Sequence, residues 1–262
     1  MDRVRLTITI RRDLIKSVDQ VIDGIGIRNR SHAIEYLLSK ATGPKVGRVF
    51  ILAGGYGIKM RPFTYEMPKS MIPVSDRPIL EHIIDNLREQ GFRDLIILIG
   101  HKGEKIKQYF GDGSKFGVRI TYVEEKKPLG TANPLHMVKD FIGKDPFIMY
   151  YGDVLAEIDF HELVDYHFEH KGLATLSLSP VEDPSAFGSV RLRGSRVISI
   201  DEKPKKTDSS SRLVNAGIHV LDPKIIDYVP KKGFSMLEKD VFPRLAKEQK
   251  IYGYPFEGKW FD

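Results

Sequence analysis

The sequence of 262 residues contains no cysteine. This absence excludes disulfide bonds, thiolate catalysis, zinc fingers and iron–sulfur clusters, so any bound metal must be held by oxygen or imidazole. Long apolar runs are also lacking, because none is longer than that of Leu95 to Ile99, which is far too short to cross a bilayer. No basic and apolar leader precedes a small-residue cleavage site. These absences predict a soluble, cytoplasmic protein that does not enter a membrane.

Proline is missing from the first 43 residues, although 15 prolines occur from Pro44 onward. The same 43 residues carry eight Lys/Arg against five acids, so half of the formal charge of +6 lies in them. The stretch from Thr42 to Lys45 places Gly and then Pro after a helical pattern, which is typical of a helix stop and a linker. We therefore predict two domains, residues 1–43 and 44–262.

The first domain has the pattern of one strand followed by two helices. Val4 to Ile10 alternates apolar and polar residues, as a half-buried strand does. Helical spacing follows over 14–22 and again over 33–38, where Asn29 is a good N-cap. A single strand cannot satisfy its own backbone groups, and 43 residues is close to the lower limit for an independent core. The pattern therefore predicts a homodimer.

Over residues 3–41 this order resembles the ribbon-helix-helix family of DNA-binding dimers, with 29–34 similar to the start of its second helix. The resemblance implies an antiparallel ribbon in the major groove and backbone amides that hold a phosphate. The alternative is a ribbon that only joins two copies and carries a solvated outer face. Whether DNA is a partner therefore stays open, and the residues that would contact DNA are Arg5, Thr7, Thr9, Arg30 and Ser31.

In the second domain, apolar runs alternate with helical stretches. This alternation predicts an α/β fold with a doubly wound, mostly parallel, Rossmann-like sheet. Ligands of such sheets bind beyond the carboxyl ends of the strands. The expected strands are 49–52, 95–99, 118–123 and 147–151, and the expected helices are 79–90, 104–109, 131–141 and 160–170.

The first strand runs into a glycine-rich turn that contains Gly54, Gly55 and Gly57. Glycine lets backbone amides approach an anion closely, although the turn matches neither the dinucleotide fingerprint nor the Walker loop. A plain tight turn is the alternative interpretation. The turn is accompanied by more cations than a turn requires, and these suit a triphosphate. They are Lys59, Arg61 and Lys69.

Several motifs in a shared order resemble the sugar-1-phosphate nucleotidyltransferases, or NDP-sugar pyrophosphorylases, over residues 47–262. The GDP-mannose pyrophosphorylase branch is suggested by 128–135, by 238–243 and by the Tyr-rich stretch before Gly258. The motifs are the glycine turn with Pro68-Lys69-Ser70-Met71-Ile72-Pro73, Pro128-Leu129-Gly130-Thr131-Ala132, Gly152-Asp153, Glu202-Lys203-Pro204, Asn215-Ala216-Gly217 and Trp260-Phe261-Asp262.

The resemblance implies transfer of a nucleotidyl group from a nucleoside triphosphate to a sugar-1-phosphate, which gives an NDP-sugar and pyrophosphate. The attacking phosphate oxygen is already anionic, so catalysis needs positioning and charge neutralisation rather than a general base. Asp153 follows a predicted strand and should stand at the carboxyl edge as a Mg²⁺ ligand, with a turn cap as the alternative. The resemblance adds Asp262 as a second ligand.

Further roles come from the resemblance alone. It implies catalytic roles for Lys59 and Lys69 beside Asp153. Nucleotide contacts are implied for Leu52, Ala53, Gly54, Gly55, Gly57, Arg61, Glu125, Gly130 and Thr131. Contacts with the sugar phosphate are implied for Gly188, Glu202, Lys203, Asn215 and Gly217. The alternatives are a solvated strand end at Glu202-Lys203-Pro204 and a strand irregularity at Asn215.

The nucleotide base is predicted from donors and acceptors. Glu125 stands where relatives selective for uracil or thymine carry glutamine. An ionised carboxylate only accepts hydrogen bonds, so it suits the ring N–H and amino group of guanine. The sequence therefore favours GTP, while UTP and dTTP stay open, and Glu124 is the alternative after a shift of one residue.

The glycine turn departs from the family pattern, because Ile58 and Lys59 replace the usual Thr and Arg. Lysine keeps the charge but loses the planar guanidinium fork, so this change puts turnover in doubt. A second hypothesis is therefore a ribbon-helix-helix transcription regulator whose second domain senses nucleotide sugars.

Overall fold

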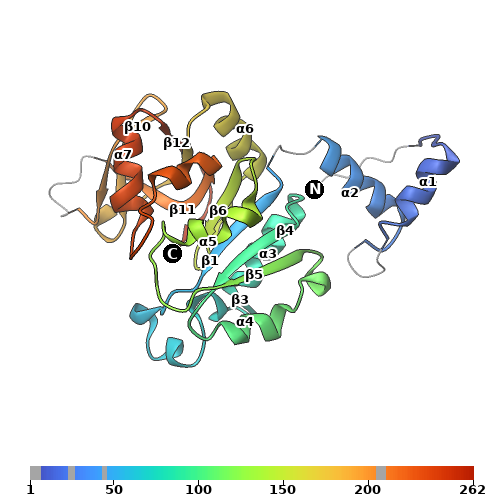
Figure 1. Cartoon of the computed structure of the whole chain (residues 1–262), viewed down its shortest axis with the longest axis horizontal. Coiled ribbons are helices and arrows are strands. Elements are labelled where there is room, and N and C mark those ends of the chain that lie inside the picture. Colours follow the sequence, from blue (N-terminus) through green and yellow to red (C-terminus); the bar gives the residue numbers. More distant parts are fainter. Residues whose placement is uncertain (1–6, 23–26, 43–45, 205–210) are drawn as a thin grey trace. The chain divides into compact units, whose positions relative to one another are not determined.

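The computed structural model describes residues 7–22, 27–42, 46–204 and 211–262. The chain divides into two compact units, Met1–Gly43 and Pro44–Asp262 (Figure 1). Each unit is described here by itself. Residues 4–6 of the predicted N-terminal strand, Arg5 among them, and residues 43–45 of the predicted linker lie outside the described residues.

The first unit contains two helices, α1 (Arg12–Asp19) and α2 (Arg30–Thr42), which pack against each other. The Asn29 side chain caps α2, because its Oδ1 accepts a hydrogen bond from the His32 amide at 3.0 Å. The predicted strand is not formed in its described part, Thr7 to Ile10. A lone strand has no partner with which to share its backbone hydrogen bonds, so the predicted ribbon needs a second copy of the chain and stays a prediction.

Few side chains of the first unit are buried. Among its described residues the buried apolar side chains are Val18 and Ala33, whereas Ile8 is 55% exposed and Leu14 is 46% exposed. The guanidinium of Arg30 holds the Asp19 carboxylate with two hydrogen bonds of 2.7 and 2.9 Å. The two helices of one copy therefore leave apolar surface uncovered.

The second unit is built on a nine-stranded sheet (Figure 1). The order β5-β4-β1-β6 forms its parallel half, which confirms the predicted strands: β1 (Arg48–Ala53), β4 (Asp94–Ile99), β5 (Arg119–Glu124) and β6 (Phe147–Tyr151). The other half continues β11-β8-β12-β10-β9, with β8 (Ala174–Pro180), β9 (Gly188–Arg193), β10 (Arg196–Glu202), β11 (Leu213–Leu221) and β12 (Ile251–Pro255).

The sheet is mixed rather than mostly parallel, which corrects the prediction. Strand β11 runs antiparallel to both of its neighbours, β6 and β8, and β10 runs antiparallel to β12 and β9. The alternation of strands and helices on which the prediction rests ends after α6 (Phe160–His170). From there β9 and β10 are joined by a short turn, which can connect only antiparallel strands.

Helices cover both faces of the sheet. Along β1, Val49 and Ile51 pack into one apolar cluster with α3 (Ile79–Glu89), α4 (Gly103–Phe110) and α6 (Phe160–His170). Phe50 packs into the other cluster with α5 (Pro134–Ile142) and α7 (Phe242–Lys247). This alternation confirms the doubly wound arrangement. Over the described part of the chain, no helix combines the length and apolar character needed to span a bilayer.

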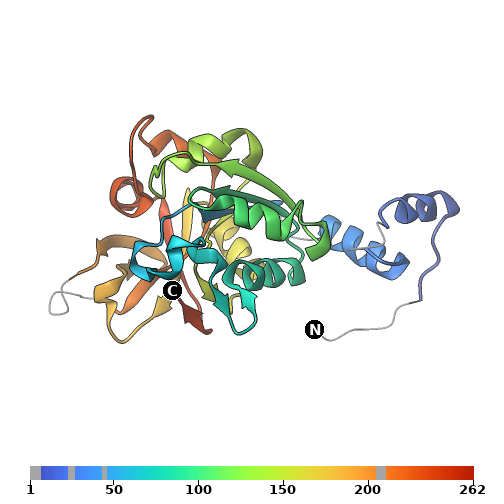
Figure 2. The ribbon, with the colours of Figure 1, turned by 90° about the horizontal axis from the view of Figure 1, so that it is seen from below.

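Short elements complete the second unit (Figure 2). The ribbon β2–β3 joins Pro73–Val74 to Arg77–Pro78, and single turns of 3-10 helix cover Ile58–Met60, Phe63–Tyr65 and Lys69–Met71. A second ribbon pairs β7 (Leu155–Ala156) with β13 (Trp260–Phe261). This ribbon brings the chain after Phe261 next to the chain before Leu155.

Two histidines are buried in the second unit. His219 on β11 lies edge-on between Tyr151 and Phe242, and in the described structure neither of its ring nitrogens has a hydrogen-bond partner. His167 on α6 shares a hydrogen bond of 2.9 Å with Thr175 Oγ1. Burial lowers the pKa of His219 to about 3, and burial lowers the pKa of His167 to about 4 against a small opposing effect of Asp222.

These pKa values predict a loss of stability in mild acid. In the unfolded chain a histidine titrates near pH 6.5, so below that pH the unfolded state binds more protons than the folded state. The free energy of unfolding should fall by about 1 kcal/mol per pH unit for each histidine as the pH drops from about 6.5 toward 4. Urea unfolding of wild type and His219→Leu at pH 7.5 and pH 5 checks this, because the variant should lose part of the dependence. Equal losses in both proteins would contradict the assignment to His219.

Candidate active site

The carboxyl ends of β1, β4 and β6 meet with little space between their backbones. The Gly152 amide after β6 donates to the Leu52 carbonyl at 2.9 Å. A Cβ on Gly100, after β4, would lie 2.6 Å from the Gly54 carbonyl oxygen. Only glycine allows this approach at position 100. Because β1, β4 and β6 are parallel, the three loops that follow them lie at one edge of the sheet.

The glycine turn presents unused backbone donors at this edge. Gly57 is in the left-handed region with a φ of 58°, and its carbonyl accepts from the Thr64 hydroxyl at 2.8 Å. Within the described residues, the amides of Gly55, Tyr56 and Gly57 donate to no protein acceptor. Successive free amides in a tight turn form a concave surface that suits an anion.

Lys69 lies directly over this turn and joins the two predicted metal ligands. Its Nζ is 2.9 Å from Asp153 Oδ2 and 3.0 Å from Asp262 Oδ1. Its Cβ lies 3.2 Å from the point that a Cβ on Gly57 would occupy, so its stem rests on the turn. Asp262 reaches this place because Phe261 pairs with Leu155 in the β13–β7 ribbon. The structure therefore brings Lys69, Asp153 and Asp262 together.

The three side chains are about one third exposed or less. Burial alone would lower the pKa of Lys69, yet its pKa is raised, because the charges and hydrogen bonds of Asp153 and Asp262 outweigh burial. The two carboxylates thus converge on one cation. In the described structure no group of three or more acidic or imidazole side chains is arranged for a metal. A Mg²⁺ ion takes one or two carboxylates and completes its shell with water and phosphate oxygens, so this pair fits it.

Glu125 lies next to Gly54 at the same edge and is buried. One carboxylate oxygen accepts from the Leu129 amide at 2.7 Å, and the other lies 3.0 Å from the point that a Cβ on Gly54 would occupy. Burial raises the pKa of Glu125, and the Leu129 hydrogen bond opposes the shift. Glu124, the alternative, is exposed and lies 3.5 Å from Lys107.

Sequence reasoning missed a hydrogen-bond network around the buried Glu238, which contacts the end of β6 at the carboxyl edge of the sheet. Glu238 lies on a single π-helical turn, Leu237–Val241, and accepts hydrogen bonds from the hydroxyls of Tyr151 and Thr131, the latter at 2.7 Å. The Thr131 hydroxyl in turn accepts from the Leu237 amide at 2.9 Å. Thr131, predicted to contact nucleotide, therefore uses its side chain in the scaffold.

Gly130 connects the loop of Glu125 to the same scaffold. Its φ is 87°, and a Cβ there would lie 2.1 Å from the Ser235 carbonyl oxygen. The Ser235 carbonyl accepts from the Ala132 amide, and the Ser235 amide donates to the Leu129 carbonyl. Glycine is thus required at position 130 because the backbone of Ser235 leaves no room for a side chain.

The predicted sugar side is formed where β9, β10 and β11 meet. Glu202 pairs with Gly188 across the strands, and a Cβ on Gly188 would lie 3.0 Å from Glu202 Oε2 and 3.9 Å from Asn215 Cβ. Gly217 has a φ of 76°, and a Cβ there would lie 3.0 Å from Tyr151 and 3.2 Å from Val154, so it packs against the chain on both sides of Asp153. Gly188, Glu202, Asn215 and Gly217 therefore gather.

Two predicted sugar-contact residues, Asn215 and Lys203, make contacts within the protein itself. Asn215 Oδ1 accepts from the Gly217 amide at 3.0 Å, so it stabilises the irregularity in β11. Lys203 is exposed, with a φ of 50°, and its Nζ lies 3.8 Å from Glu202 Oε1. Trp260 lies beside the group, since its indole N–H donates to the Ala216 carbonyl and its ring packs on Phe187.

Among the described residues, the two other cations near the glycine turn make no ion pair with the aspartates. Lys59 is exposed and, among the described residues, makes no ion pair. Arg61 stacks on the Tyr65 ring at 4.9 Å. Ile58 beside them is 61% exposed. The structure therefore does not place Lys59 or Arg61 with Lys69.

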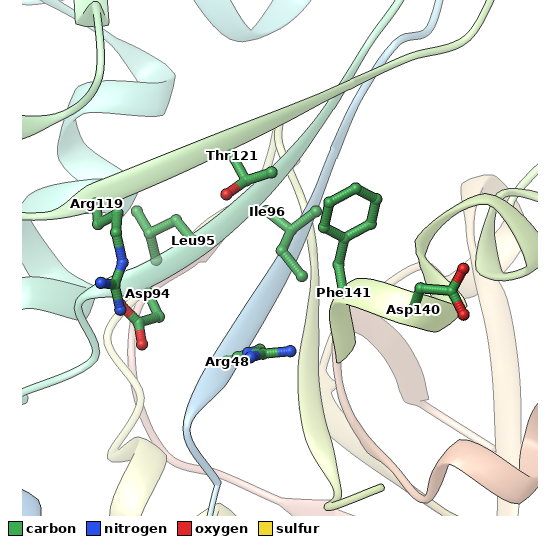
Figure 3. Close-up of a pocket in the computed structure, with 8 residues that line it drawn as sticks. All are labelled: Arg48, Asp94, Leu95, Ile96, Arg119, Thr121, Asp140 and Phe141. Carbon is green, nitrogen blue, oxygen red and sulfur yellow. The ribbon is translucent and has the colours of Figure 1, made fainter. Parts of the chain in front are cut away.

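A separate hollow of about 370 Å³ opens at the amino ends of β1, β4 and β5 (Figure 3). Figure 3 shows Arg119 turned toward Asp94, while Asp140 points away from this pair. The two arginines and two aspartates that line the hollow cancel in charge, and none of the predicted site residues lines it. Because ligands of such sheets bind at the carboxyl ends, the candidate site is the opposite edge.

Solved structures with the same fold define the class of the second unit. A putative glucose-1-phosphate thymidylyltransferase from Bacillus anthracis superimposes with a TM-score of 0.76 at 28% identity, covering 83% of this chain and 89% of that one. HddC from Yersinia pseudotuberculosis, complexed with GMP-PN, gives a TM-score of 0.71 at 24% identity and covers 83% and 93%. The fold is that of the nucleotide-diphospho-sugar transferases.

The chain belongs to the nucleotidyl transferase family, whose sequence profile matches residues 48–262. Mannose-1-phosphate guanyltransferase from Saccharomyces cerevisiae is 36% identical over 218 residues, which cover 81% of this chain and 60% of the yeast protein. The catalytic subunit beta of the Drosophila melanogaster mannose-1-phosphate guanylyltransferase is 34% identical over 226 residues, with 84% and 60% covered. The chain thus spans about 60% of the length of these relatives.

Proposed function

We propose that the protein transfers a nucleotidyl group from a nucleoside triphosphate to a sugar-1-phosphate, giving an NDP-sugar and pyrophosphate. The observation that carries this proposal is the meeting of Lys69, Asp153 and Asp262 over a turn with free amides. Family membership and the names of the relatives support it. The same names favour GTP and mannose-1-phosphate as substrates.

The residues of the site fit the parts of this reaction. The amides of Gly55, Tyr56 and Gly57 bind the phosphates, and Lys69 neutralises them. Asp153 and Asp262 would hold Mg²⁺, which when bound neutralises charge at the phosphates. The chain orients a sugar-phosphate oxygen in line with the α-phosphorus. That oxygen forms the new bond as the bond to pyrophosphate breaks, without a general base.

A panel assay tests the reaction. Pyrophosphate release is followed with pyrophosphatase and malachite green, using Mg²⁺ with GTP, UTP or dTTP and mannose- or glucose-1-phosphate. We expect release that requires both substrates and is fastest with GTP and mannose-1-phosphate. Absence of release with every pair, also from a chain extended past Asp262, would contradict the proposed activity.

Glu125 is proposed to select guanine, and its amide variant tests this. In Glu125→Gln the side chain gains donors, which suit the mixed edge of uracil or thymine. The ratio of kcat/KM for GTP to that for UTP should fall by about tenfold or more. The matched control is Glu124→Gln, which should leave the ratio unchanged. A shift in the control and not in Glu125→Gln would move the role to Glu124.

The first unit is proposed to be a ribbon-helix-helix module that joins two copies. The two packed helices, the Asn29 cap and the exposed Ile8 and Leu14 support this proposal. In the full chain, Leu14→Glu should convert a dimer to a monomer in sedimentation equilibrium, because it places charge in an apolar interface. The control Lys16→Glu on the same helix should stay dimeric. A monomeric wild type, or a dimeric Leu14→Glu, would contradict the proposal.

The regulator hypothesis is favoured by the exposed Ile58 and Lys59, which leave the family loop without its usual side chains. The Arg30 guanidinium is bound to Asp19, so only its backbone amide and that of Ser31 are offered to a phosphate. Fluorescence anisotropy with duplex DNA distinguishes the two functions. Binding that weakens with salt and changes on addition of nucleotide supports a regulator. No binding at low salt leaves the module as a dimerisation device.

A further inference from the structure

Lys69 occupies the point on which the two proposed metal ligands converge. Its Nζ bonds to both carboxylates, at 2.9 and 3.0 Å, and the described structure shows no other cation at either of them. A divalent ion that binds the same two oxygens needs distances near 2.1 Å and repels an ammonium group beside it. Lys69 and the metal therefore compete for one position.

The Lys69 ammonium can also reach the proposed phosphate site on the glycine turn. Its stem rests on Gly57, and the free amides of Gly55, Tyr56 and Gly57 form the proposed phosphate cradle beside it. A lysine side chain carries a compact charge on a flexible four-carbon stem, so its ammonium can turn toward phosphate oxygens without movement of the backbone. The backbone at Asp262 is held near that of Asp153, since Phe261 pairs with Leu155 in the β13–β7 ribbon.

We propose that Lys69 is a built-in substitute for the metal, which keeps divalent ions out of the nucleotide-free site and releases Asp153 and Asp262 when a triphosphate draws its ammonium away. Metal and nucleotide then bind with positive cooperativity. This inference rests on the proposed function, because it takes the ligand of the glycine turn to be a triphosphate. Lys69 is in this respect a positioning residue for the metal as well as a phosphate ligand.

The test measures Mn²⁺ binding to the full chain by the loss of the free-ion signal in electron paramagnetic resonance. Wild type without nucleotide should bind Mn²⁺ weakly, and Lys69→Met should bind it roughly tenfold more tightly, within the usual range of coupling between ligands. A non-hydrolysable GTP analogue should strengthen Mn²⁺ binding in wild type. Because Mn²⁺ also binds free nucleotide, this comparison is made against the analogue alone at the same concentration.

Three controls tie the effect to this site. Lys144→Met removes an exposed cation from the loop before β6, outside the site, and it should leave Mn²⁺ binding without nucleotide unchanged. Adding Asp153→Asn to Lys69→Met should abolish the gain. Lys69→Gln should repeat the gain if Lys69→Met folds poorly. Mn²⁺ binding to both Lys69 variants that is no tighter than to wild type would overturn the inference.

The inference and the proposed function fail in different ways. If wild type releases pyrophosphate in the panel assay while the Lys69 variants bind Mn²⁺ no better, the inference alone is wrong. If wild type shows no turnover while the variants gain a Mn²⁺ site, the exchange at Lys69 holds and the activity is wrong. Mn²⁺ binding is therefore informative without any measurement of rate.

Discussion

Replacing Asp153 by asparagine should lower kcat/KM for nucleotidyl transfer by about a thousandfold or more, while the fold is retained. The amide has the same shape but no charge, so the site loses one of the two carboxylates that would hold the metal. Lys69 keeps its contact with Asp262 and continues to neutralise phosphate. The loss should therefore fall mainly on kcat rather than on nucleotide affinity.

A matched control separates this effect from a general loss of acid charge. Asp145 is an exposed aspartate in the loop before β6, and Asp145→Asn should keep wild-type rates. Circular dichroism and urea unfolding of both variants show whether the fold is intact. Turnover by Asp153→Asn within tenfold of wild type would mean that the metal ligand lies elsewhere.

Glu238→Ala should produce the largest loss of stability, about 3 kcal/mol, for a reason unrelated to catalysis. The buried carboxylate accepts the hydroxyls of the partly buried Tyr151 and Thr131, so its removal leaves two donors unsatisfied and opens a cavity. Glu238→Gln keeps the volume and one acceptor oxygen, and should lose about 1 kcal/mol or less. The difference between the two midpoints of urea unfolding measures the network.

The same pair of variants tests whether the network supports the active site. Tyr151 precedes Gly152 and Asp153, so a vacant space behind it should loosen the metal ligand as well as the core. We expect kcat to fall in Glu238→Ala even where the protein is fully folded. Equal stability of the alanine and glutamine variants would contradict the role given to Glu238.

The parallel half of the sheet and the position of Asp153 could be predicted because both depend on local patterns. Apolar runs mark β1, β4, β5 and β6, and the residue that follows a parallel strand must lie at its carboxyl edge. The glycine turn was found for the same reason, since it follows β1 directly. The mixed half was missed because strand direction depends on pairings such as β11 with β6 and β8, which no local pattern records.

Contacts between distant segments account for the rest of the difference. The salt bridge from Lys69 to Asp262 spans 193 positions and depends on the two-residue strand β13. The bond from Thr131 to Glu238 spans 107 positions. The sequence around Glu238 gave no sign of burial, and only the resemblance over 238–243 pointed to this segment. Charged side chains are usually solvated, and the buried Glu238 is an exception.

The central claim is that the triphosphate and its metal bind at the carboxyl edge between the glycine turn and the paired aspartates. Anomalous diffraction from crystals soaked with Mn²⁺ and a non-hydrolysable GTP analogue tests it most directly. We expect one manganese peak held by Asp153 and Asp262, with phosphates on the amides of Gly55 to Gly57. The Lys69 ammonium should then contact the phosphates. Nucleotide density in the hollow lined by Arg48 and Phe141, or manganese away from both aspartates, would contradict it.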